Sequence, residues 1–424
     1  MKYAIETLGC KVNQFETQAM EALLISRGHI STSGGDADVV IVNTCAVTGE
    51  SERKSRQALR SLRRENPKAF AALCGCASQT SPHDARKLGA DVIYGTGDRI
   101  KFVDDIEKLV SDRRKTENID DPFRRTVFET LAPGAIDGRT RAYIKIQDGC
   151  DNFCTYCVIP YARGRVRSLG IEEASNQAKS LVSQGFREIV ITGIEISSYG
   201  KDFRNGERLC DVICEIAKSA EDARIRLGSL EPRVITEEFC QSLAEMGNIC
   251  PHFHLSLQSG CDKTLKDMGR KYDTARFFES TKLLRRYFSN CALTADLIVG
   301  FPGESEGDFE ETLDFINKCA FSSMHIFPYS KRKGTPAADR VDQIEKSEKS
   351  ARAKRARLIS DQNSMAYLHS CIGKTLCVLF ENESYGHSEN YCKILAVNGA
   401  TRGEMAKVLV TGAKKDTLIG EKLD

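Results

Sequence analysis

Two blocks of the sequence alternate short apolar stretches with helical ones, and this alternation limits the fold more than any other feature. In the first block we predict strands and helices in turn. The strands fall at 3–8, 38–43, 70–74 and 91–94, and the helices at 14–28, 49–66, 82–89 and 99–112. Repeats of this kind form parallel sheets with helices on their faces. We therefore predict an α/β domain over residues 1–112.

The second block begins at residue 140 and has the same strand–helix alternation. Its strands are predicted at 142–147, 188–192, 224–228, 252–257, 292–299 and 322–327, with helices between them. Such βα units indicate a partial (β/α)6 barrel over residues 140–362. The active site of such a barrel lies at the carboxyl ends of its strands.

The remaining segments have other patterns. Residues 113–139 are polar and contain Pro122 and Pro133, which indicates a linker. A charged helix is predicted over 343–366. In the last segment, 365–424, short strands at 375–380, 391–397 and 406–411 predict a small all-β barrel, a type that often binds single-stranded nucleic acid. A module that only packs against a sheet edge is the alternative.

Three cysteines, Cys150, Cys154 and Cys157, share one loop directly after the first strand of the second block. This C-x3-C-x2-C spacing brings three thiolates close enough to bind three irons of a four-iron cluster, and no local fourth cysteine follows. Because electron-transfer clusters usually have four cysteine ligands, three indicate an iron left open for a substrate or cofactor. The alternatives are a loop of ordinary small apolar residues and a zinc site, which prefers four ligands at paired spacing.

Cys10, Cys45 and Cys76 each follow a predicted strand of the first block. Since the carboxyl ends of parallel strands meet at one sheet edge, where ligands bind, these three cysteines are predicted to lie together. Burial as three separate thiols is the alternative.

The composition limits the setting in which this chemistry takes place. The chain has 17 cysteines, and residues 1–6 show no apolar signal region, so we expect a cytoplasmic protein with metal-binding or reactive thiols rather than disulfides. No apolar run approaches the ~20 residues of a membrane span. Two basic stretches, 51–68 and 331–357, favour a polyanionic partner, although solvated helix faces also carry such charge.

The cysteine loop resembles the signature of radical S-adenosylmethionine (SAM) enzymes, and the whole chain resembles radical SAM methylthiotransferases. The further motifs that match this family, in order, are LGCKVNQ at 8–14, VNTCAVT at 42–48, GCASQ at 75–79, PYARGR at 160–165, RLGSLEP at 226–232, HLSLQSG at 254–260 and DLIVGFPGE at 296–304. The resemblance implies a cysteine-bearing N-terminal domain, a radical SAM barrel and a C-terminal barrel of the TRAM type.

The resemblance also implies two [4Fe-4S] clusters and S-adenosyl-L-methionine as cofactor. Cys150, Cys154 and Cys157 would hold the catalytic cluster that cleaves SAM. Cys10, Cys45 and Cys76 would hold an auxiliary cluster that supplies sulfur, although Cys74 could compete with Cys76. Further residues expected to bind the cofactor are Tyr156, Gly193, Glu195, Gln258, Asp296 and Gly300. Arg163 and Arg165 either lie in a surface loop or contact RNA phosphate.

Members of this family modify an adenosine beside the tRNA anticodon or an aspartate of a ribosomal protein. The CKVNQ run at 10–14 is similar to the bacterial branch that acts on N6-threonylcarbamoyladenosine in tRNA. The resemblance therefore implies the tRNA anticodon loop as partner, with an external sulfur source and an electron donor. The alternatives are isopentenyladenosine in tRNA, the ribosomal aspartate, or a non-enzymatic iron–sulfur or RNA-binding module.

Overall fold

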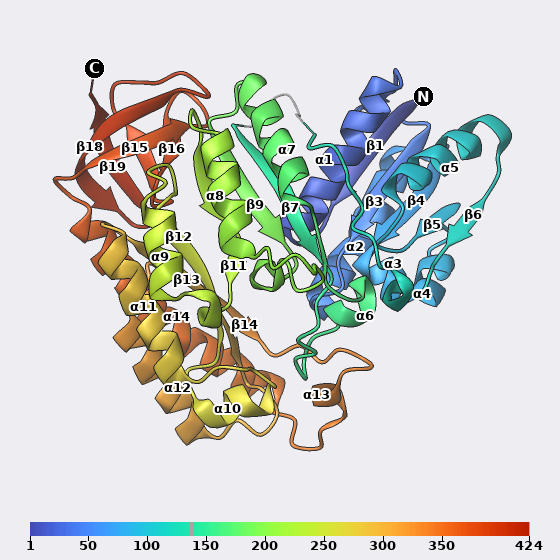
Figure 1. Cartoon of the computed structure of the whole chain (residues 1–424). Coiled ribbons are helices and arrows are strands. Elements are labelled where there is room, and N and C mark those ends of the chain that lie inside the picture. The colour runs from blue at the N-terminus through green and yellow to red at the C-terminus, as the bar shows by residue number, and fades with distance from the viewer. Residues whose placement is uncertain (135–139, 424) are drawn as a thin grey trace.

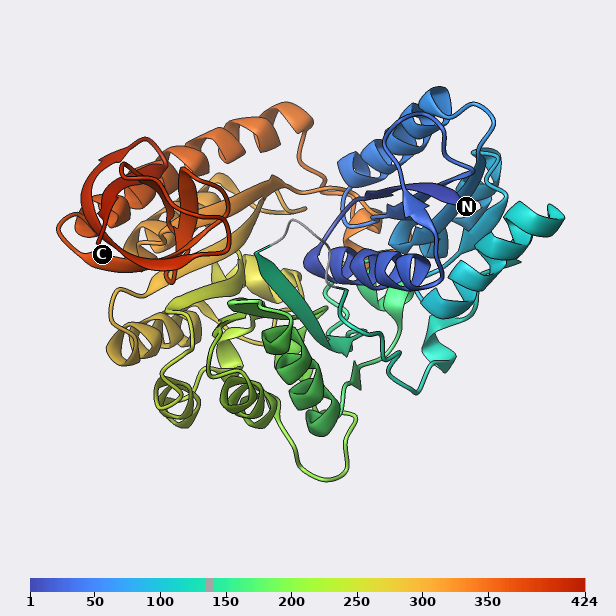
Figure 2. The ribbon, with the colours of Figure 1, turned by 90° about the horizontal axis from the view of Figure 1, so that it is seen from above.

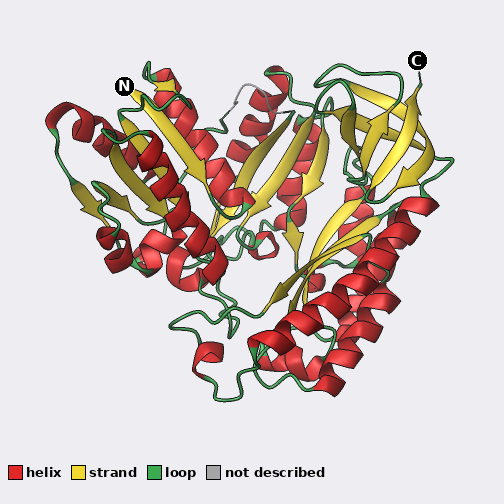
Figure 3. Cartoon of the chain, turned by 180° about the vertical axis from the view of Figure 1, so that it is seen from behind, coloured by secondary structure: helices red, strands yellow, loops and turns green. Residues whose placement is uncertain are grey.

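The computed structural model describes residues 1–134 and 140–423. A central α/β part lies between an N-terminal α/β part and a small C-terminal β-barrel (Figure 1). Seen from above, the two outer parts lie on opposite sides of the central strands (Figure 2). The mixed α/β architecture that the sequence predicts is confirmed (Figure 3).

The N-terminal part is a six-stranded parallel sheet in the order β2-β1-β3-β4-β5-β6. Its strands are β1 (Lys2–Thr7), β2 (Ile30–Ser31), β3 (Val39–Thr44), β4 (Phe70–Gly75), β5 (Val92–Tyr94) and β6 (Thr116–Asn118). Its helices are α1 (Lys11–Ser26), α2 (Gly49–Glu65), α3 (Cys76–Thr80), α4 (Pro82–Lys87) and α5 (Arg99–Asp112). Helices α1 and α5 bury one face of the sheet, and α2 and α4 bury the other.

The segment 113–139, for which a linker is predicted, is partly structured. Strand β6 extends the N-terminal sheet, and the 3-10 helix η1 (Pro122–Arg124) follows it. Leu131 is buried against Phe15 and Ala19 of α1. The sequence gives no apolar alternation here, because β6 is only three residues long and pairs at the sheet edge. Residues 135–139 of the predicted linker lie outside the described residues.

The central part contains the predicted partial barrel. Its strands are β7 (Arg141–Asp148), β8 (Arg167–Ser168), β9 (Glu188–Gly193), β10 (Arg224–Leu227), β11 (Ser229–Leu230), β12 (His252–Gln258), β13 (Ala292–Val299) and β14 (Ser323–Pro328). They form two sheets, β10-β9-β7-β8 and β11-β12-β13-β14, which Gly228 connects between β10 and β11. All pairs are parallel except β7 with β8, a short edge strand that the sequence does not predict.

Helices cover the outer face of these strands and leave the inner face open to the N-terminal part. They are α6 (Ile159–Arg163), α7 (Ile171–Ser183), α8 (Leu209–Ser219), α9 (Glu237–Ala244), α10 (Asp262–Asp267), α11 (Thr274–Tyr287), α12 (Glu306–Cys319), α13 (Pro336–Asp339) and α14 (Lys346–Ser370), with the 3-10 helices η2 (Ile196–Ser198) and η3 (Pro232–Val234). Alternate strand residues such as Ile189, Ile191 and Ile225 enter one large apolar core with these helices. The remaining alternate positions, including Arg226, therefore face inward.

The C-terminal part is a closed barrel in the order β15-β16-β17-β19-β18. Its strands are β15 (Thr375–Phe380), β16 (Tyr385–Ser388), β17 (Lys393–Ala396), β18 (Met405–Lys414) and β19 (Thr417–Lys422). The sequence does not predict β16 or β19, because a glycine, Gly386 or Gly420, interrupts the apolar pattern of each. Helix α14 runs without a break through residues 362–365, where the domain boundary is predicted, and Leu368 at its end packs into the core of this barrel.

A buried ionic network attaches the C-terminal barrel to the central part. Glu188 at the start of β9 accepts hydrogen bonds from Arg224 at 2.6 Å and from Arg226 at 2.9 Å. The same guanidinium groups donate to backbone carbonyls of the barrel, Arg224 to Cys377 at 2.7 Å and Arg226 to Glu389 at 3.0 Å. The barrel therefore closes one end of the inner face in a fixed orientation.

Candidate active site

The loop that carries Cys150, Cys154 and Cys157 is held by backbone contacts on both sides. The backbone N–H of Cys150 donates to Gly164 at 3.0 Å, and that of Cys157 donates to Cys154 at 2.9 Å. Gly149 begins the loop at φ +72°, and a Cβ atom there would lie 1.8 Å from the carbonyl oxygen of Arg165. Because no side chain fits at that distance, a glycine is required where the chain leaves β7.

Burial and hydrogen-bond donors act in opposite directions on the thiols of this loop. Burial, together with the neighbouring thiol of Cys154, raises the pKa of Cys157 to about 12. Burial also raises the pKa of Cys150, while the backbone N–H of Asn152 acts in the opposite direction. The guanidinium of Arg270 donates to the sulfur of Cys154 at 3.3 Å. A cation and backbone N–H groups directed at the sulfurs suit thiolates bound to a metal centre, which must displace their protons.

Cys10, Cys45 and Cys76 lie together at the carboxyl edge of the N-terminal sheet. Gly9, at φ +109°, allows the approach of Cys45, since a Cβ atom at Gly9 would lie 2.9 Å from its sulfur. Burial raises the pKa of Cys76 to about 12, and the neighbouring Cys10 and Cys45 add to this rise. Burial and Cys10 likewise raise the pKa of Cys45. All three thiols are therefore within electrostatic reach of one another.

Cys74, the alternative to Cys76, lies elsewhere. It is buried in the apolar core with Tyr94 and Phe102, on the face of the sheet that α1 and α5 cover. Burial raises its pKa to about 11, and Arg99 and Glu16 are the charges that act on it most strongly. This position favours Cys76 as the third member of the N-terminal set.

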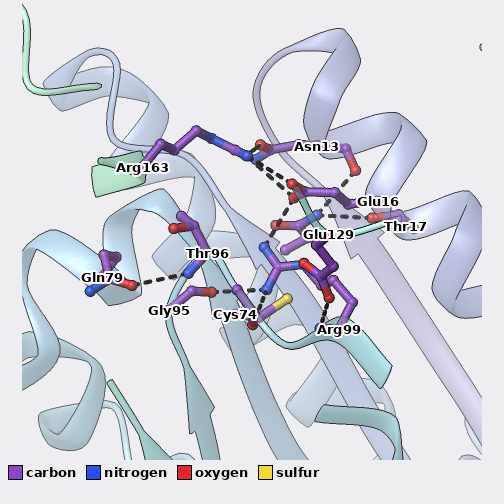
Figure 4. A network of polar contacts seen from close by, with 12 residues as sticks. Asn13, Glu16, Thr17, Cys74, Gln79, Gly95, Thr96, Arg99, Glu129 and Arg163 are labelled. Atoms are coloured by element: carbon purple, nitrogen blue, oxygen red, sulfur yellow. Dashed lines mark hydrogen bonds and ion pairs between the residues drawn. The ribbon is translucent and has the colours of Figure 1, made fainter. Parts of the chain in front are cut away.

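A fully buried charge network connects the two sets of cysteines. Arg163, at the end of α6, donates to Glu16 of α1 at 2.7 Å, to Asp148 at 3.1 Å and to Asn13 at 2.9 Å. Figure 4 shows Arg163 pointing from α6 toward Asn13 and Glu16. The amide of Asn13 in turn donates to the carbonyl of Leu8 at 2.8 Å and to that of Thr44 at 3.1 Å. These carbonyls belong to the turns that precede Cys10 and Cys45.

Both arginines are predicted to lie in a surface loop or to contact RNA phosphate. The structure contradicts this for Arg163 and places Arg165 on the surface. Arg163 has no exposed surface, so it is neither in a solvated loop nor available to RNA phosphate. The side chain of Arg165 is 58% exposed and pairs with Asp151 at 3.2 Å. The sequence motif could not separate the two, because the ion partners of Arg163 come from distant segments.

The loops that follow the two sets of cysteines are in direct contact. Ala46, which follows Cys45, forms one small apolar cluster with Cys76 and with Val158 and Ala162 of the α6 region. Val158 directly follows Cys157. The two sets therefore meet where the N-terminal sheet abuts the central barrel, as two cooperating sites require.

The residues expected to bind the cofactor lie at or after the ends of the inner strands, except Asp296. Gly193 ends β9, Gln258 ends β12 at φ +68°, and Gly300 follows β13 at φ +70°. Asp296 lies in the middle of β13 rather than at its end, where it pairs with His254 at 3.2 Å. Asp296 is therefore three residues before the end of this strand, which is predicted with the bounds that the structure shows.

Glu195 and Tyr156 have partners within the protein. Glu195 accepts a hydrogen bond from Asn152 of the cysteine loop at 3.3 Å, and burial raises its pKa, with the negative charge of Glu231 as the second cause. The ring of Tyr156 packs edge-to-face on Phe301 with centroids 6.5 Å apart. Glu195 is therefore adjacent to the cysteine loop.

The sequence analysis missed two charged residues of this site. Arg270, which contacts Cys154, follows α10 in a segment without a family motif. The only local sign of a turn before it is Gly269. Glu16 lies on α1 within a run of polar residues and reads as a surface position. Only its burial at 0% exposure among Arg163, Arg99 and Lys145 shows its role.

The two predicted basic stretches lie side by side in the fold. Arg332 pairs with Glu52 at the start of α2, and the hydroxyl of Ser330 accepts a hydrogen bond from the backbone N–H of Gly49 at 3.1 Å. Much of the second stretch is neutralised by ion pairs, for example Arg352 with Glu304 at 2.7 Å. Cations of both stretches therefore remain for a polyanionic partner, among them exposed lysines such as Lys331 and Lys333 and the exposed arginines of α2.

Two further observations concern the part of the chain that the structure describes. Within residues 1–134 and 140–423, no three His, Cys, Asp or Glu side chains converge tightly enough to hold a single metal ion. A cluster spaces its ligands more widely, since each thiolate binds a different iron. In the same residues, no helix is both long and apolar enough to cross a bilayer.

Comparisons with known proteins agree with this architecture. Residues 144–316 match the radical SAM superfamily, and residues 2–95 match an uncharacterized protein family, UPF0004. The threonylcarbamoyladenosine tRNA methylthiotransferase MtaB of Bacillus subtilis (strain 168) is 39% identical, over 92% of this chain and 89% of that protein. The chain belongs to the radical SAM methylthiotransferase family. It is an enzyme of the radical SAM class, for which the family implies a [4Fe-4S] cluster and SAM.

Other relatives and solved structures extend this result. MtaB of Thermotoga maritima is 38% identical over 99% of this chain and 96% of its own length. A tRNA-2-methylthio-N(6)-dimethylallyladenosine synthase of Bacillus pumilus is 33% identical over 99% of this chain and 85% of its own length. The radical SAM methyltransferase TsrM of Kitasatospora setae has a TM-score of 0.59 at 14% identity, over 80% of this chain and 77% of that one, which shows the shared fold.

Proposed function

We propose that this enzyme inserts a methylthio group at C2 of N6-threonylcarbamoyladenosine next to the anticodon of a tRNA, in the cytoplasm. The observation that carries the proposal is the contact between the loops of the two cysteine sets, through Ala46, Cys76 and Val158. A reaction that both activates a C–H bond and delivers sulfur requires two centres close to one substrate atom. Two relatives named for this nucleoside are 38% and 39% identical, against 33% for the dimethylallyladenosine enzyme of Bacillus pumilus.

In this proposal each cysteine set holds one [4Fe-4S] cluster. Cys150, Cys154 and Cys157 would hold the catalytic cluster, which would bind SAM at its open iron and, once reduced by an external one-electron donor, would supply the electron for its cleavage. Cys10, Cys45 and Cys76 hold the auxiliary cluster. The donor sets fit these groups, because each supplies three thiols and all but Cys10 are shielded from solvent at least in part.

The chain's own residues position the reactants. Arg270 stabilises the negative charge on Cys154. We propose that Glu195, held by Asn152, accepts the amino group of SAM, while Tyr156, Gly193, Gln258, Asp296 and Gly300 line the rest of its site. Arg163 and Asn13 fix the separation of the two cysteine sets. The exposed cations of α2 provide a surface for the RNA backbone.

The test is anaerobic reconstitution followed by nucleoside analysis. The reconstituted enzyme is expected to bind about eight irons per chain, twice the content of a single cubane. Replacing Cys150, Cys154 and Cys157 by alanine is expected to remove half of the iron and to abolish 5′-deoxyadenosine formation. Replacing Cys10, Cys45 and Cys76 removes the other half and abolishes methylthio insertion, but SAM cleavage continues.

The substrate is tested with two tRNAs, one carrying N6-threonylcarbamoyladenosine and one carrying N6-dimethylallyladenosine, under an external sulfide source and a one-electron reductant. Mass spectrometry of the digested RNA is expected to show the methylthio product from the first tRNA alone. A product from the second tRNA alone would assign the enzyme to the other branch. Absence of 5′-deoxyadenosine in every reaction would favour a non-enzymatic iron–sulfur protein.

A further inference from the structure

Lys11 occupies an unusual position between the two halves of the enzyme. It is the first residue of α1 and directly follows Cys10. Helix α1 packs against β7 and β9 of the central part, so its first turn faces the inner side of the barrel. The Lys11 side chain is exposed, and among the residues that the structure describes it has no carboxylate within ion-pair distance.

The charges around Lys11 belong to the inner face of the barrel rather than to its own domain. Four charged groups of the central strands lie within electrostatic range of Lys11: Arg141 of β7, Glu188 of β9, Arg226 of β10 and Asp296 of β13. The exposed Lys11 side chain is therefore on the side of α1 that faces the inner strands of the barrel.

The other charges on this inner face already have partners. The guanidinium of Arg226 lies 2.9 Å from the carboxylate of Glu188, and Asp296 lies 3.2 Å from His254. An ammonium without a carboxylate partner attracts an anionic ligand group. Lys11 is therefore the cation on this face that is available to a ligand.

The candidate nucleosides differ in this respect. The threonylcarbamoyl group on N6 carries a carboxylate, whereas the dimethylallyl group is a neutral hydrocarbon. In the adenine ring, C2 and C6 are the two carbons that flank N1. The substituent on N6 is therefore close to C2, the carbon that receives sulfur. Cys10 and Lys11 are adjacent in sequence, which matches this adjacency of the sulfur-accepting carbon and the N6 substituent.

We propose that Lys11 is a specificity-determining residue whose ammonium binds the carboxylate of the N6-threonylcarbamoyl group. This inference rests on the proposed function. It provides a physical reason for the choice of this nucleoside: the anionic substituent gains an ion pair, and a hydrocarbon substituent would leave the ammonium desolvated and unpaired.

The test compares Lys11→Met and Lys11→Arg with the unmodified enzyme on two tRNAs, one with the threonylcarbamoyl carboxylate free and one with it converted to the methyl ester. Loss of a hydrogen-bonded charge pair is expected to raise KM for the free acid by about 10- to 100-fold in Lys11→Met, and the arginine variant should recover most of it. Lys101→Met, an exposed lysine on α5, is the matched control and should behave as the unmodified enzyme.

The decisive quantity is the ratio of kcat/KM for acid over ester, measured within each variant. This ratio cancels any change in cluster content or in the amount of folded protein. The unmodified enzyme, the Lys101→Met control and Lys11→Arg are expected to prefer the acid, and Lys11→Met to show a ratio near one. An acid preference that survives in Lys11→Met overturns the inference, while the proposed function stands. Failure of the unmodified enzyme to modify either tRNA overturns the proposed function itself.

Discussion

Replacement of Glu16 by glutamine tests how the two cysteine sets are held together. Glu16 has no exposed surface and lies among three cations, with nitrogen–oxygen distances of 2.7 Å to Arg163, 3.0 Å to Arg99 and 3.5 Å to Lys145. Arg99 belongs to the N-terminal part, whereas Arg163 and Lys145 belong to the central part. A neutral amide keeps the shape of the side chain but leaves these cations with less compensating charge.

The magnitude follows from the charge environment. Burial alone would raise the pKa of Glu16, but Arg163, Arg99 and Lys145 outweigh it and lower the pKa from 4.5 to about 2. A shift of that size corresponds to about 3 kcal/mol. Removing one member of a buried ionic group costs about 3–5 kcal/mol. Because the folded pKa is depressed, this stability is present above the unfolded pKa and is lost as pH falls toward about 2.

The assay is urea unfolding at pH 7 of the metal-free chain, with the variant beside the unmodified protein. For a slope of about 3 kcal/mol per M, a loss of about 3 kcal/mol moves the midpoint by about 1 M. The matched control is Glu50→Gln, whose carboxylate forms an exposed pair with Arg53 at 2.6 Å, and its midpoint should not change. Equal midpoints for Glu16→Gln and the control would refute the reasoning. So would a difference that persists unchanged at pH 2.

Three further outcomes follow from the structure. Gly75→Ala, at φ +102° with the new Cβ 2.4 Å from the carbonyl oxygen of Thr44, should displace the turn before Cys76 and halve the bound iron, measured by iron assay; full iron content would contradict this. Glu188→Gln should release the C-terminal barrel, because it leaves buried arginines unpaired at a cost of about 3–5 kcal/mol, and limited proteolysis after residue 370 should become faster. Arg270→Met removes the donor to the sulfur of Cys154, so the reduction potential of the cluster bound there should fall in an EPR-monitored titration; an unchanged potential would argue against a cluster at this loop.

Much of the architecture could be predicted because it repeats a local pattern. Each long parallel strand, such as β3 or β13, is a continuous apolar run or an alternation between turn residues, and the predicted ranges agree with the observed bounds within a few residues. The strands that were missed are short or at an edge. β8 has two residues, and β6 has three, so neither carries enough alternation to stand out from a loop.

The site was predictable to the extent that it depends on sequence spacing. The loop from Cys150 to Cys157 is local, and the proximity of Cys10 and Cys45 follows from parallel strands ending at one edge. The ion partners were not predictable, because Arg163 and Glu16 are 147 residues apart in the chain. A charged residue has the same letter whether it is solvated or buried, and only the assembled fold distinguishes the two.

Charged contacts, rather than buried apolar area, fix how the N-terminal and central parts are placed relative to each other. The apolar clusters that bridge the cysteine sets are small, and that around Cys76 and Val158 has only a few members. A small apolar patch tolerates sliding, since its energy depends on buried area and not on direction. The bidentate contacts of Arg163 with Glu16 and Asn13 have fixed directions, so a shift of about 1 Å would break them. An enzyme that must deliver sulfur from one centre to a carbon activated at another requires such a fixed separation. The buried charges therefore fix the separation of the two cysteine sets, despite the free-energy cost of their desolvation.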